Sequence, residues 1–272
     1  MHGSAIDRLI ERLAGEPAVL VSVESTQGSA PREAGAWMAV FGDGATVGTV
    51  GGGHLEFEAI AIARRALARE AIEPTRRFAL GPSLGQCCGG AVDLRFEMLQ
   101  PAQAGPLRQR LEAAEDGARM PVALFGGGHV GHAIVEALRP LPVCVHWIDS
   151  RDAVFPSDLP RWVRTEHSAP VEAAVADVAP GSRVLVMSFS HAEDLGIVAA
   201  CLLRRRARAD LPFVGLIGSR SKWASFRHRL QARGFTEAEL AAVTSPIGVP
   251  GVVGKEPAVI AAAVAAQLMQ QR

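Results

Sequence analysis

The sequence predicts an α/β protein in which an N-terminal α+β domain is followed by a doubly wound parallel sheet. Strand-like and helical runs alternate through the second half of the chain, which is typical of parallel sheets. A glycine-rich turn, residues 126–131, lies between the first strand-like run of that half and the helical run after it. The first half instead combines a hairpin signal, Gly42-Asp43-Gly44, with one longer helical run, and this mixture favours an α+β arrangement.

We expect the first domain to cover residues 1–99. Its predicted helices cover residues 4–14 and 55–70, and its predicted strands cover residues 18–24, 36–41, 46–50, 76–80 and 91–98. Residues 100–118 contain Pro101, Gly105, Pro106 and Gly117. This composition predicts a linker with a short helix at 107–115.

The second predicted domain covers residues 119–272. Its strand-like runs lie at 120–125, 142–148, 183–188 and 212–217, and its helical runs lie near 130–139, 171–176, 192–206, 222–232 and 255–270. In an open parallel sheet of this kind, ligands bind beyond the carboxyl ends of the strands. Polar residues that directly follow these strands are therefore candidate ligand contacts.

Composition excludes several classes of protein. The 272 residues are 49% hydrophobic and 21% charged, far from the disordered regime. Lys plus Arg and Asp plus Glu both number 28, so the overall charge gives no argument for nucleic acid or an anionic membrane. The N-terminal segment lacks the apolar core of a signal peptide, and no apolar run reaches the roughly 18 residues of a membrane span. We therefore expect a cytoplasmic protein.

The turn at 126–131, Gly-Gly-Gly-His-Val-Gly, fits the dinucleotide fingerprint in the required strand–turn–helix context. Gly126 permits the tight turn, Gly128 lets a phosphate approach the backbone, and Gly131 allows close helix–strand packing. Asp149 ends the next strand, about 20 residues on, where an acidic group would accept a hydrogen bond from a ribose hydroxyl. The context predicts a Rossmann-like domain, while the ligand stays open between NAD(P), another phosphorylated molecule and none.

A second glycine triplet, residues 51–53, also precedes a histidine and a helix. It follows a hairpin, and Glu56 occupies the place of the third fingerprint glycine. Gly52 and Gly53 are candidates to cradle an oxyanion. The alternative is a strand-to-helix turn that needs positive φ.

Other candidate ligand contacts lie on loops. Ser29 and Arg32 place a hydroxyl and a guanidinium on one loop, suited to an anion. His191, Ser219 and Arg220 begin helices directly after strands. The alternatives are a surface turn for the first pair and plain helix caps for the others.

Four cysteines are present, and no Cys-x-x-Cys pair occurs, so a structural zinc site is not expected. Cys87 and Cys88 are adjacent, which places their Cα atoms too close for an ordinary disulfide. They lie among Gly85, Gly89 and Gly90. As thiols they are candidate soft ligands or nucleophiles, or else small buried side chains.

Taken in order, these motifs resemble the XdhC/CoxI family of xanthine dehydrogenase accessory proteins. The matching stretches span nearly the whole chain and are GSAPREAGAWM (28–38), GTVGGGHLE (48–56), LGQCCGG (84–90), LFGGGHVG (124–131), the DSR of 149–151, SFSHAEDL (188–195), GLIGSRSKW (215–223), SPIG (245–248) and GKEPAVIAAAVAAQL (254–268). One position departs from the family pattern, because Ser245 stands where members often carry cysteine. This departure argues against a mechanism that requires a second thiol at this position.

The resemblance implies an N-terminal XdhC domain and a C-terminal Rossmann domain. It further implies a cytoplasmic homodimer that binds the molybdenum cofactor (molybdopterin), keeps it while its terminal sulfur is installed, and delivers it to apo-xanthine dehydrogenase. A cysteine desulfurase would be the sulfur-supplying partner, and the protein itself would not be an enzyme. The cysteine suspected of contacting the cofactor metal falls on Cys88. We hypothesise that the ligand spans a cleft between the domains with its phosphate on the Rossmann edge.

Two other functions stay open. An NAD(P)-dependent oxidoreductase explains Gly126, Gly128, Gly131 and Asp149 equally well. It leaves the motifs of the first domain unexplained, and a chain with no tyrosine excludes mechanisms that need a tyrosine acid. A regulatory or scaffold protein with an empty Rossmann domain is the third interpretation.

Overall fold

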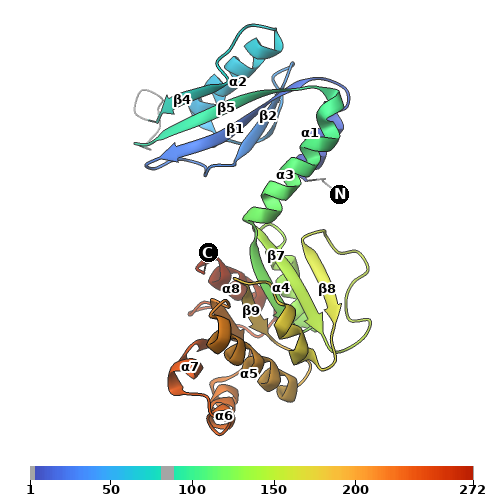
Figure 1. Ribbon diagram of the computed structural model, residues 1–272, viewed down its shortest axis with the longest axis vertical. Coiled ribbons are helices and arrows are strands. Elements are labelled where there is room, and N and C mark those ends of the chain that lie inside the picture. Colours follow the sequence, from blue (N-terminus) through green and yellow to red (C-terminus); the bar gives the residue numbers. More distant parts are fainter. Residues whose placement is uncertain (1–3, 81–88, 272) are drawn as a thin grey trace. The chain divides into compact units, whose positions relative to one another are not determined.

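The computed structural model describes residues 4–80 and 89–271 and divides the chain into two compact units, Met1–Gly117 and Ala118–Arg272. Figure 1 shows an antiparallel sheet in the first unit and a parallel sheet flanked by helices in the second. The predicted fold class, an α+β domain followed by a Rossmann-like doubly wound sheet, is confirmed.

The first unit is a five-stranded antiparallel sheet in the order β3-β2-β1-β5-β4. The strands are β1 (Ala18–Gln27), β2 (Trp37–Phe41), β3 (Thr46–Gly48), β4 (Thr75–Ala79) and β5 (Ala91–Leu99). β1 pairs with β5 from Ala18 opposite Leu99 to Gln27 opposite Ala91. The end of β1 therefore lies beside the start of β5.

Helices cover both faces of this sheet. They are α1 (Ala5–Leu13), α2 (Gly53–Leu67) and α3 (Ala104–Ala118), with the 3-10 turn η2 (Pro101–Gln103) before α3. Alternate β1 residues point to opposite faces, so Val19, Val21 and Val23 pack in the core beneath α2. Ala18 and Leu20 pack on the other face, with apolar side chains of α1 and α3.

The segment predicted as a linker belongs to the first unit. Instead of a short helix at 107–115, residues 104–118 form a continuous helix, and the division between units falls after Gly117. Leu107 and Leu111, four residues apart on one helix face, are buried with Ile6 and Leu9 of α1. This apolar stripe docks the helix despite the flanking glycines and prolines.

The second unit is a six-stranded parallel sheet in the order β11-β10-β9-β6-β7-β8. Its strands are β6 (Met120–Phe125), β7 (Val143–Asp149), β8 (Val163–His167), β9 (Arg183–Val186), β10 (Phe213–Leu216) and β11 (Val243–Thr244). If the six strands are numbered 1 to 6 in chain order, starting at β6, the sheet reads 3-2-1-4-5-6 from β8 across to β11. This is the strand order of dinucleotide-binding folds. The strand order reverses between β6 and β9, which marks that edge as the expected ligand site.

Helices pack on both faces of the parallel sheet. They are α4 (His129–Leu138), α5 (His191–Arg208), α6 (Arg220–Gln231), α7 (Glu237–Ala241) and α8 (Pro257–Met269), together with the 3-10 segment η3 (Val171–Asp177). One core contains Val143, Val145 and Trp147 of β7 with α4 and α8. The other contains Ile148 with η3, α5 and α6. This alternation along β7 fixes which side chains reach the carboxyl edge.

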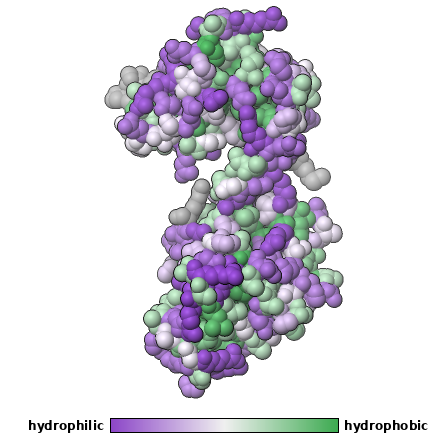
Figure 2. Space-filling view, in the orientation of Figure 1, coloured by the Kyte–Doolittle hydropathy of each residue, from purple (hydrophilic) through white to green (hydrophobic). Residues whose placement is uncertain are grey.

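Hydrophilic side chains cover much of the visible face of each unit (Figure 2). Within the residues that the structure describes, no helix combines the length and apolarity needed to span a bilayer. Cys201 of α5 is fully buried, and burial raises the pKa of its thiol to about 12. It is therefore an inert core residue rather than a reactive thiol.

Candidate functional site

The glycine turn after β6 is shaped by two close backbone approaches. Gly126 has φ +131°, and a Cβ there would lie 2.0 Å from the Met187 carbonyl oxygen, which belongs to the segment after β9. A Cβ at Gly131 would lie 2.1 Å from the Gly126 oxygen. Gly126 therefore requires glycine for packing across the point where the strand order reverses, and Gly131 requires it for packing of α4 against the turn after β6.

Gly128 differs from these two glycines. It is the N-cap of α4, has φ −82°, and makes no side-chain cap bond. A Cβ there would meet nothing within 4 Å. The first amide groups of α4 thus lie beneath open space, the geometry that a phosphate uses at a helix N-terminus.

Asp149 at the end of β7 is 1% exposed, and the chain itself supplies its hydrogen-bond donors. Its carboxylate accepts bonds from the Gly127 N–H at 2.6 Å, the Arg151 N–H at 2.9 Å, and the Arg151 Nε and Nη2 groups at 2.9 Å each. Burial opposes ionisation, but the bonds from Arg151 and Gly127 outweigh it and lower the pKa of Asp149. A ribose hydroxyl would reach this carboxylate only by displacing one of these donors.

The ends of β9 and β10 are joined by a buried ion pair. Lys222 Nζ lies 2.5 Å from Asp194 Oδ2 and donates to the Ile217 carbonyl at 2.9 Å. Asp194 also accepts bonds from the Ser188 N–H at 2.8 Å and the Ser188 hydroxyl at 2.7 Å. The loops after both strands are thereby fixed to one carboxylate.

The sequence-predicted residues after β9 and β10 lie at this same edge. His191 is exposed on the first turn of α5 and meets the Phe226 ring edge-on, 6.2 Å between centroids. Ser219 caps α6 by accepting a bond from the Lys222 N–H at 3.2 Å, and Arg220 is exposed beside it. The capping alternative thus describes Ser219, whereas Arg220 and His191 are exposed.

In the first unit, three glycine motifs that are distant in sequence come together. A Cβ at Gly90 would lie 2.3 Å from the Ser29 carbonyl oxygen, and one at Gly51 would lie 2.4 Å from Pro31 Cγ. The loop of residues 28–32 therefore contacts both the triplet 51–53 and the Gly89-Gly90 pair. We call this meeting point the glycine junction.

The triplet at the glycine junction encloses a carboxylate of its own helix. Glu56 Oε1 accepts bonds from the Thr49 hydroxyl at 2.5 Å, the Val50 N–H at 3.0 Å and the Gly51 N–H at 3.3 Å. Partial burial opposes ionisation, but these bonds, with one from the Gly52 backbone, lower the pKa of Glu56. An internal anion thus occupies part of the predicted oxyanion cradle.

Ser29, Arg32 and Gly53 of the junction are exposed, and Gly52 is partly buried. Gly52 caps α2 with φ +82°, where an added Cβ would meet nothing within 4 Å, and Gly53 opens the helix. Cys87 and the predicted metal contact Cys88 lie outside the described residues. Within residues 4–80 and 89–271, no group of three or more His, Cys, Asp or Glu side chains is placed to hold a metal ion.

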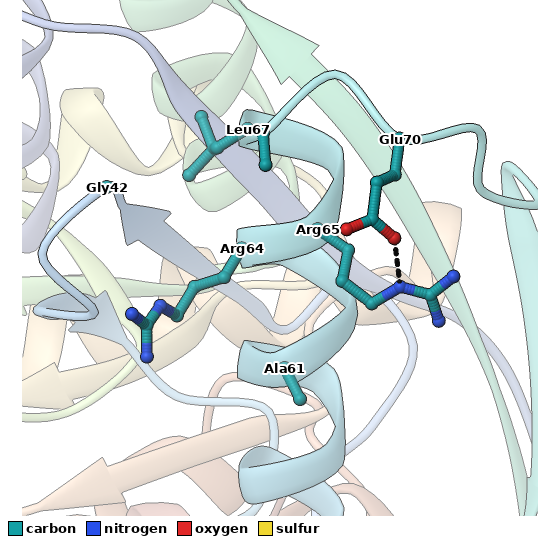
Figure 3. Close-up of a pocket in the computed structure, with 7 residues that line it drawn as sticks. Gly42, Ala61, Arg64, Arg65, Leu67 and Glu70 are labelled. Carbon is teal, nitrogen blue, oxygen red and sulfur yellow. Dashed lines mark hydrogen bonds and ion pairs between the residues drawn. The ribbon is translucent and has the colours of Figure 1, made fainter.

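A hollow of about 590 Å³ lies at the other end of α2 (Figure 3). It is lined by Gly42, Ala61, Arg64, Arg65, Leu67, Ala68 and Glu70. Arg65 Nε pairs with Glu70 at 2.6 Å, and Arg64 extends beside Gly42. None of the sequence-predicted site residues lines this hollow.

The structure thus brings the predicted residues into two groups. Ser29, Arg32, Gly52 and Gly53 gather at the glycine junction, and Gly126, Gly128, Gly131, Asp149, His191, Ser219 and Arg220 gather at the carboxyl edge of the parallel sheet. Sequence reasoning missed the internal partners Glu56, Arg151 and Asp194. All three lie inside the family-like sequence motifs, but the sequence does not show which residues they contact in the fold.

These features define a two-unit protein whose second unit is a Rossmann domain, with an uncapped helix N-terminus at the carboxyl edge of its sheet. The comparisons agree. A model of the XdhC Rossmann domain matches residues 122–268, and a model of the XdhC and CoxI family matches residues 12–79. The chain belongs to the XdhC and CoxI family, as the sequence motifs had indicated.

Two individual proteins are also similar. YqeB of Escherichia coli (strain K12) is 26% identical over 260 residues, which cover 93% of this chain and 43% of that protein. The chain thus spans less than half the length of this curated relative. A Bacillus halodurans crystal structure, described as a xanthine dehydrogenase, matches with a TM-score of 0.71 and 19% identity over 98% of this chain and 95% of that chain. That likeness establishes the shared fold.

Proposed function

We propose that the protein is an accessory protein of xanthine dehydrogenase maturation. It would bind the molybdenum cofactor, support installation of the terminal sulfur, and deliver the cofactor to the apo-enzyme. The observation that carries this proposal is the glycine junction, which unites the loop 28–32, the triplet 51–53 and the Gly89-Gly90 pair. A nicotinamide oxidoreductase has no need of that junction.

The chemistry of the cargo suits the donors that the chain offers. The cofactor is a pterin with a phosphate and a dithiolene-bound metal. Gly128 leaves the first amides of α4 open to a phosphate, and Ser219 and Arg220 lie at the same sheet edge. Ser29 and Arg32 offer a hydroxyl and a guanidinium at the glycine junction. Cys88, two residues before Gly90, would supply a soft contact near the metal.

In this proposal the cofactor is cargo and is not turned over. The partners would be the molybdenum subunit of apo-xanthine dehydrogenase, a cysteine desulfurase and a second copy of this chain, all in the cytoplasm. His191 would contribute a hydrogen bond to the ligand at the sheet edge. Gly126 and Gly131 would keep the backbone close enough for Gly128 to face the phosphate.

Retention of cofactor tests this proposal. The purified protein is mixed with molybdenum cofactor, passed through a desalting column and oxidised, and the released pterin is measured by fluorescence. We expect pterin to elute with the protein and the loaded protein to activate apo-xanthine dehydrogenase. Elution of the protein without pterin would contradict the proposal.

The role of Cys88 has its own test. Cys88→Ser should lower the retained pterin several-fold and leave the unfolding midpoint unchanged. Cys144→Ser, which changes a thiol in β7 of the other unit, is the matched control and should retain pterin like the wild type. Equal retention by both variants would remove Cys88 from the site.

The NAD(P)-dependent oxidoreductase remains the second candidate, because the 3-2-1-4-5-6 strand order is that of dinucleotide-binding folds. The internal saturation of Asp149 weighs against a ribose contact there. Titration with NADH and NADPH, followed by nicotinamide fluorescence, separates the two functions. Tight binding with substrate-dependent oxidation would favour the oxidoreductase.

A further inference from the structure

An exposed aromatic ring projects from the carboxyl edge of the parallel sheet. Phe189 follows β9, at the point where the strand order reverses, and is 67% exposed. The loop that carries it is fixed on both sides. Ser188 is bound to Asp194, the Phe189 N–H donates to Glu193 Oε2 at 3.2 Å, and Ser190 caps α5 by accepting from the Glu193 N–H at 3.2 Å. The loop is thus fixed by hydrogen bonds, while the ring that it carries is exposed to solvent.

A guanidinium lies over this ring. The Arg151 Cζ atom is 4.7 Å from the centroid of Phe189. Two N–H groups of Arg151 donate to Asp149, so the guanidinium plane is fixed. The Ser150 hydroxyl donates to Glu193 Oε1 at 2.6 Å and ties the end of β7 to the start of α5. Two acids, Asp149 and Glu193, therefore hold Arg151 and Phe189 together.

We propose that Phe189 and Arg151 form a stacking platform for the planar heterocycle of a phosphorylated ligand. Flat aromatic rings and guanidinium planes are the surfaces on which proteins stack pterins and nucleobases. In this role Asp149 is the internal anchor of Arg151 rather than an acceptor for ribose hydroxyls. Ligand binding should then depend on the ring and hardly on the sugar.

Charge separates the platform from the phosphate subsite. Asp149 and Glu193 place two carboxylates around the single cation of Arg151. A neutral ring suits these surroundings better than a phosphate does. The phosphate would instead lie at the open amides of α4, beside Gly128. The platform rests on the proposed function, and it assigns the ring and the phosphate of the cargo to different parts of one edge.

The test uses the full chain and a stable fluorescent probe, the pterin phosphate obtained by oxidising molybdenum cofactor. Stacking should quench its fluorescence. Phe189→Leu keeps apolar volume but removes the flat ring, and should raise the dissociation constant about 10-fold or more. Phe189→Trp should bind like the wild type. Leu203→Ala is the control: Leu203 is also an exposed apolar residue but lies on α5, and its replacement should leave the dissociation constant unchanged.

A second arm identifies the ring. Guanosine monophosphate and cytidine monophosphate compete against the probe, and their 2′-deoxy forms should compete equally well. Competition by either nucleotide supports stacking, and the stronger competitor shows whether the platform prefers a fused two-ring base or a single-ring base. Unchanged affinity in Phe189→Leu, or failure of the wild type to bind any of these rings, would overturn the platform. Retention of intact cofactor by Phe189→Leu at the wild-type level would then leave the proposed function standing, whereas loss of retention by the wild type would end the function itself.

Discussion

The two glycine triplets have the same sequence, Gly-Gly-Gly, but differ in backbone conformation and in the carboxylate that they contact. In the first unit all three glycines have positive φ, +135°, +82° and +62°, and the turn encloses Glu56 from its own helix. In the second unit only Gly126 of the triplet has positive φ, +131°, and the Gly127 amide is bound by Asp149 from the neighbouring strand. The first triplet is thus a local turn, and the second is a site of close packing between the segments that follow neighbouring strands.

A glycine motif therefore indicates a backbone requirement and does not by itself indicate a ligand. Each triplet presents amides to a carboxylate of the same chain, so part of its anion-binding capacity is used internally. A Cβ would meet nothing within 4 Å at Gly52 in the first unit, although the Gly52 amide is used by Glu56, and at Gly128 in the second. These two positions separate the glycines that support the fold from those that leave room for a ligand.

We expect the greatest loss of stability when a Cβ is added at the closely packed glycine of the second triplet, Gly126. Gly126→Ala would place that atom 2.0 Å from a backbone oxygen at a positive φ, so we expect a loss of roughly 4 kcal/mol in the free energy of unfolding from strain plus overpacking. Gly51→Ala also has a positive φ but meets the Pro31 side chain rather than a backbone atom, so a smaller loss of about 2 kcal/mol is expected. Gly128→Ala should cost less than about 0.5 kcal/mol. Chemical denaturation measures the loss in all three variants, and equal losses would contradict the distinction between these glycines.

The two carboxylates should differ next. Asp149→Asn removes the charge that holds Arg151 in a buried site, and we expect a loss of about 3 kcal/mol. Glu56→Gln acts on a half-buried group and should cost about 1 kcal/mol. Hydrogen exchange of the Gly127 and Gly51 amides would locate each effect. A larger loss for Glu56→Gln would contradict the assignment of Asp149 as the buried anchor.

The two units should also differ, by a smaller amount, in how their stability depends on pH. His146 of β7 is buried, and Arg164, which can only donate, bonds to its Nδ1 at 2.7 Å. Burial and the charge of Arg164 lower the pKa of His146, outweighing Glu166. The unfolded chain therefore binds a proton first, and the second unit should lose stability as the pH falls below about 6.5.

In the first unit, the lowered pKa of Glu56 has the same sign, but its loss begins only below a pH of about 4.3. Hydrogen exchange at pH 7 and pH 5 should show opening in the second unit alone. His146→Gln should flatten that pH dependence. Parallel opening of both units between these pH values would disagree with this account.

The smallest effect concerns the helix caps. Ser219→Ala removes the hydroxyl that accepts the Lys222 N–H and should cost about 1 kcal/mol. Gly128, the cap of α4, makes no side-chain bond, so its replacement by alanine should cost less. Thermal denaturation of the two variants compares them directly. A greater loss in Gly128→Ala would mean that its backbone, not its open space, requires glycine.

Most elements followed from the sequence because their signals are local. The fingerprint turn, the alternating apolar runs and the long helices α2 and α5 lie where the periodicity placed them. β8 was missed because it is an edge strand with mostly exposed side chains, and β11 because it has two residues. The helix α7 was missed as well, being only five residues long.

The site was predicted as a set of motifs but not as an arrangement. Nothing in the local sequence announces that Gly90 packs on Ser29, that Lys222 pairs with Asp194, or that Arg151 saturates Asp149. Each of these contacts joins segments through tertiary packing or the turn geometry of a loop. For Asp149 the consequence is specific, because the fingerprint assigned its carboxylate to a ribose and the fold pairs it with Arg151.

The proposed function requires that this chain holds a phosphorylated metal-pterin and does not consume it. One preparation of the protein should be loaded with molybdenum cofactor, separated from the excess, and divided between a pterin assay and a nicotinamide oxidation assay. We expect close to one pterin for each chain and no oxidation of NADH or NADPH above the protein-free rate. Sustained nicotinamide oxidation by a preparation that carries no pterin would contradict it.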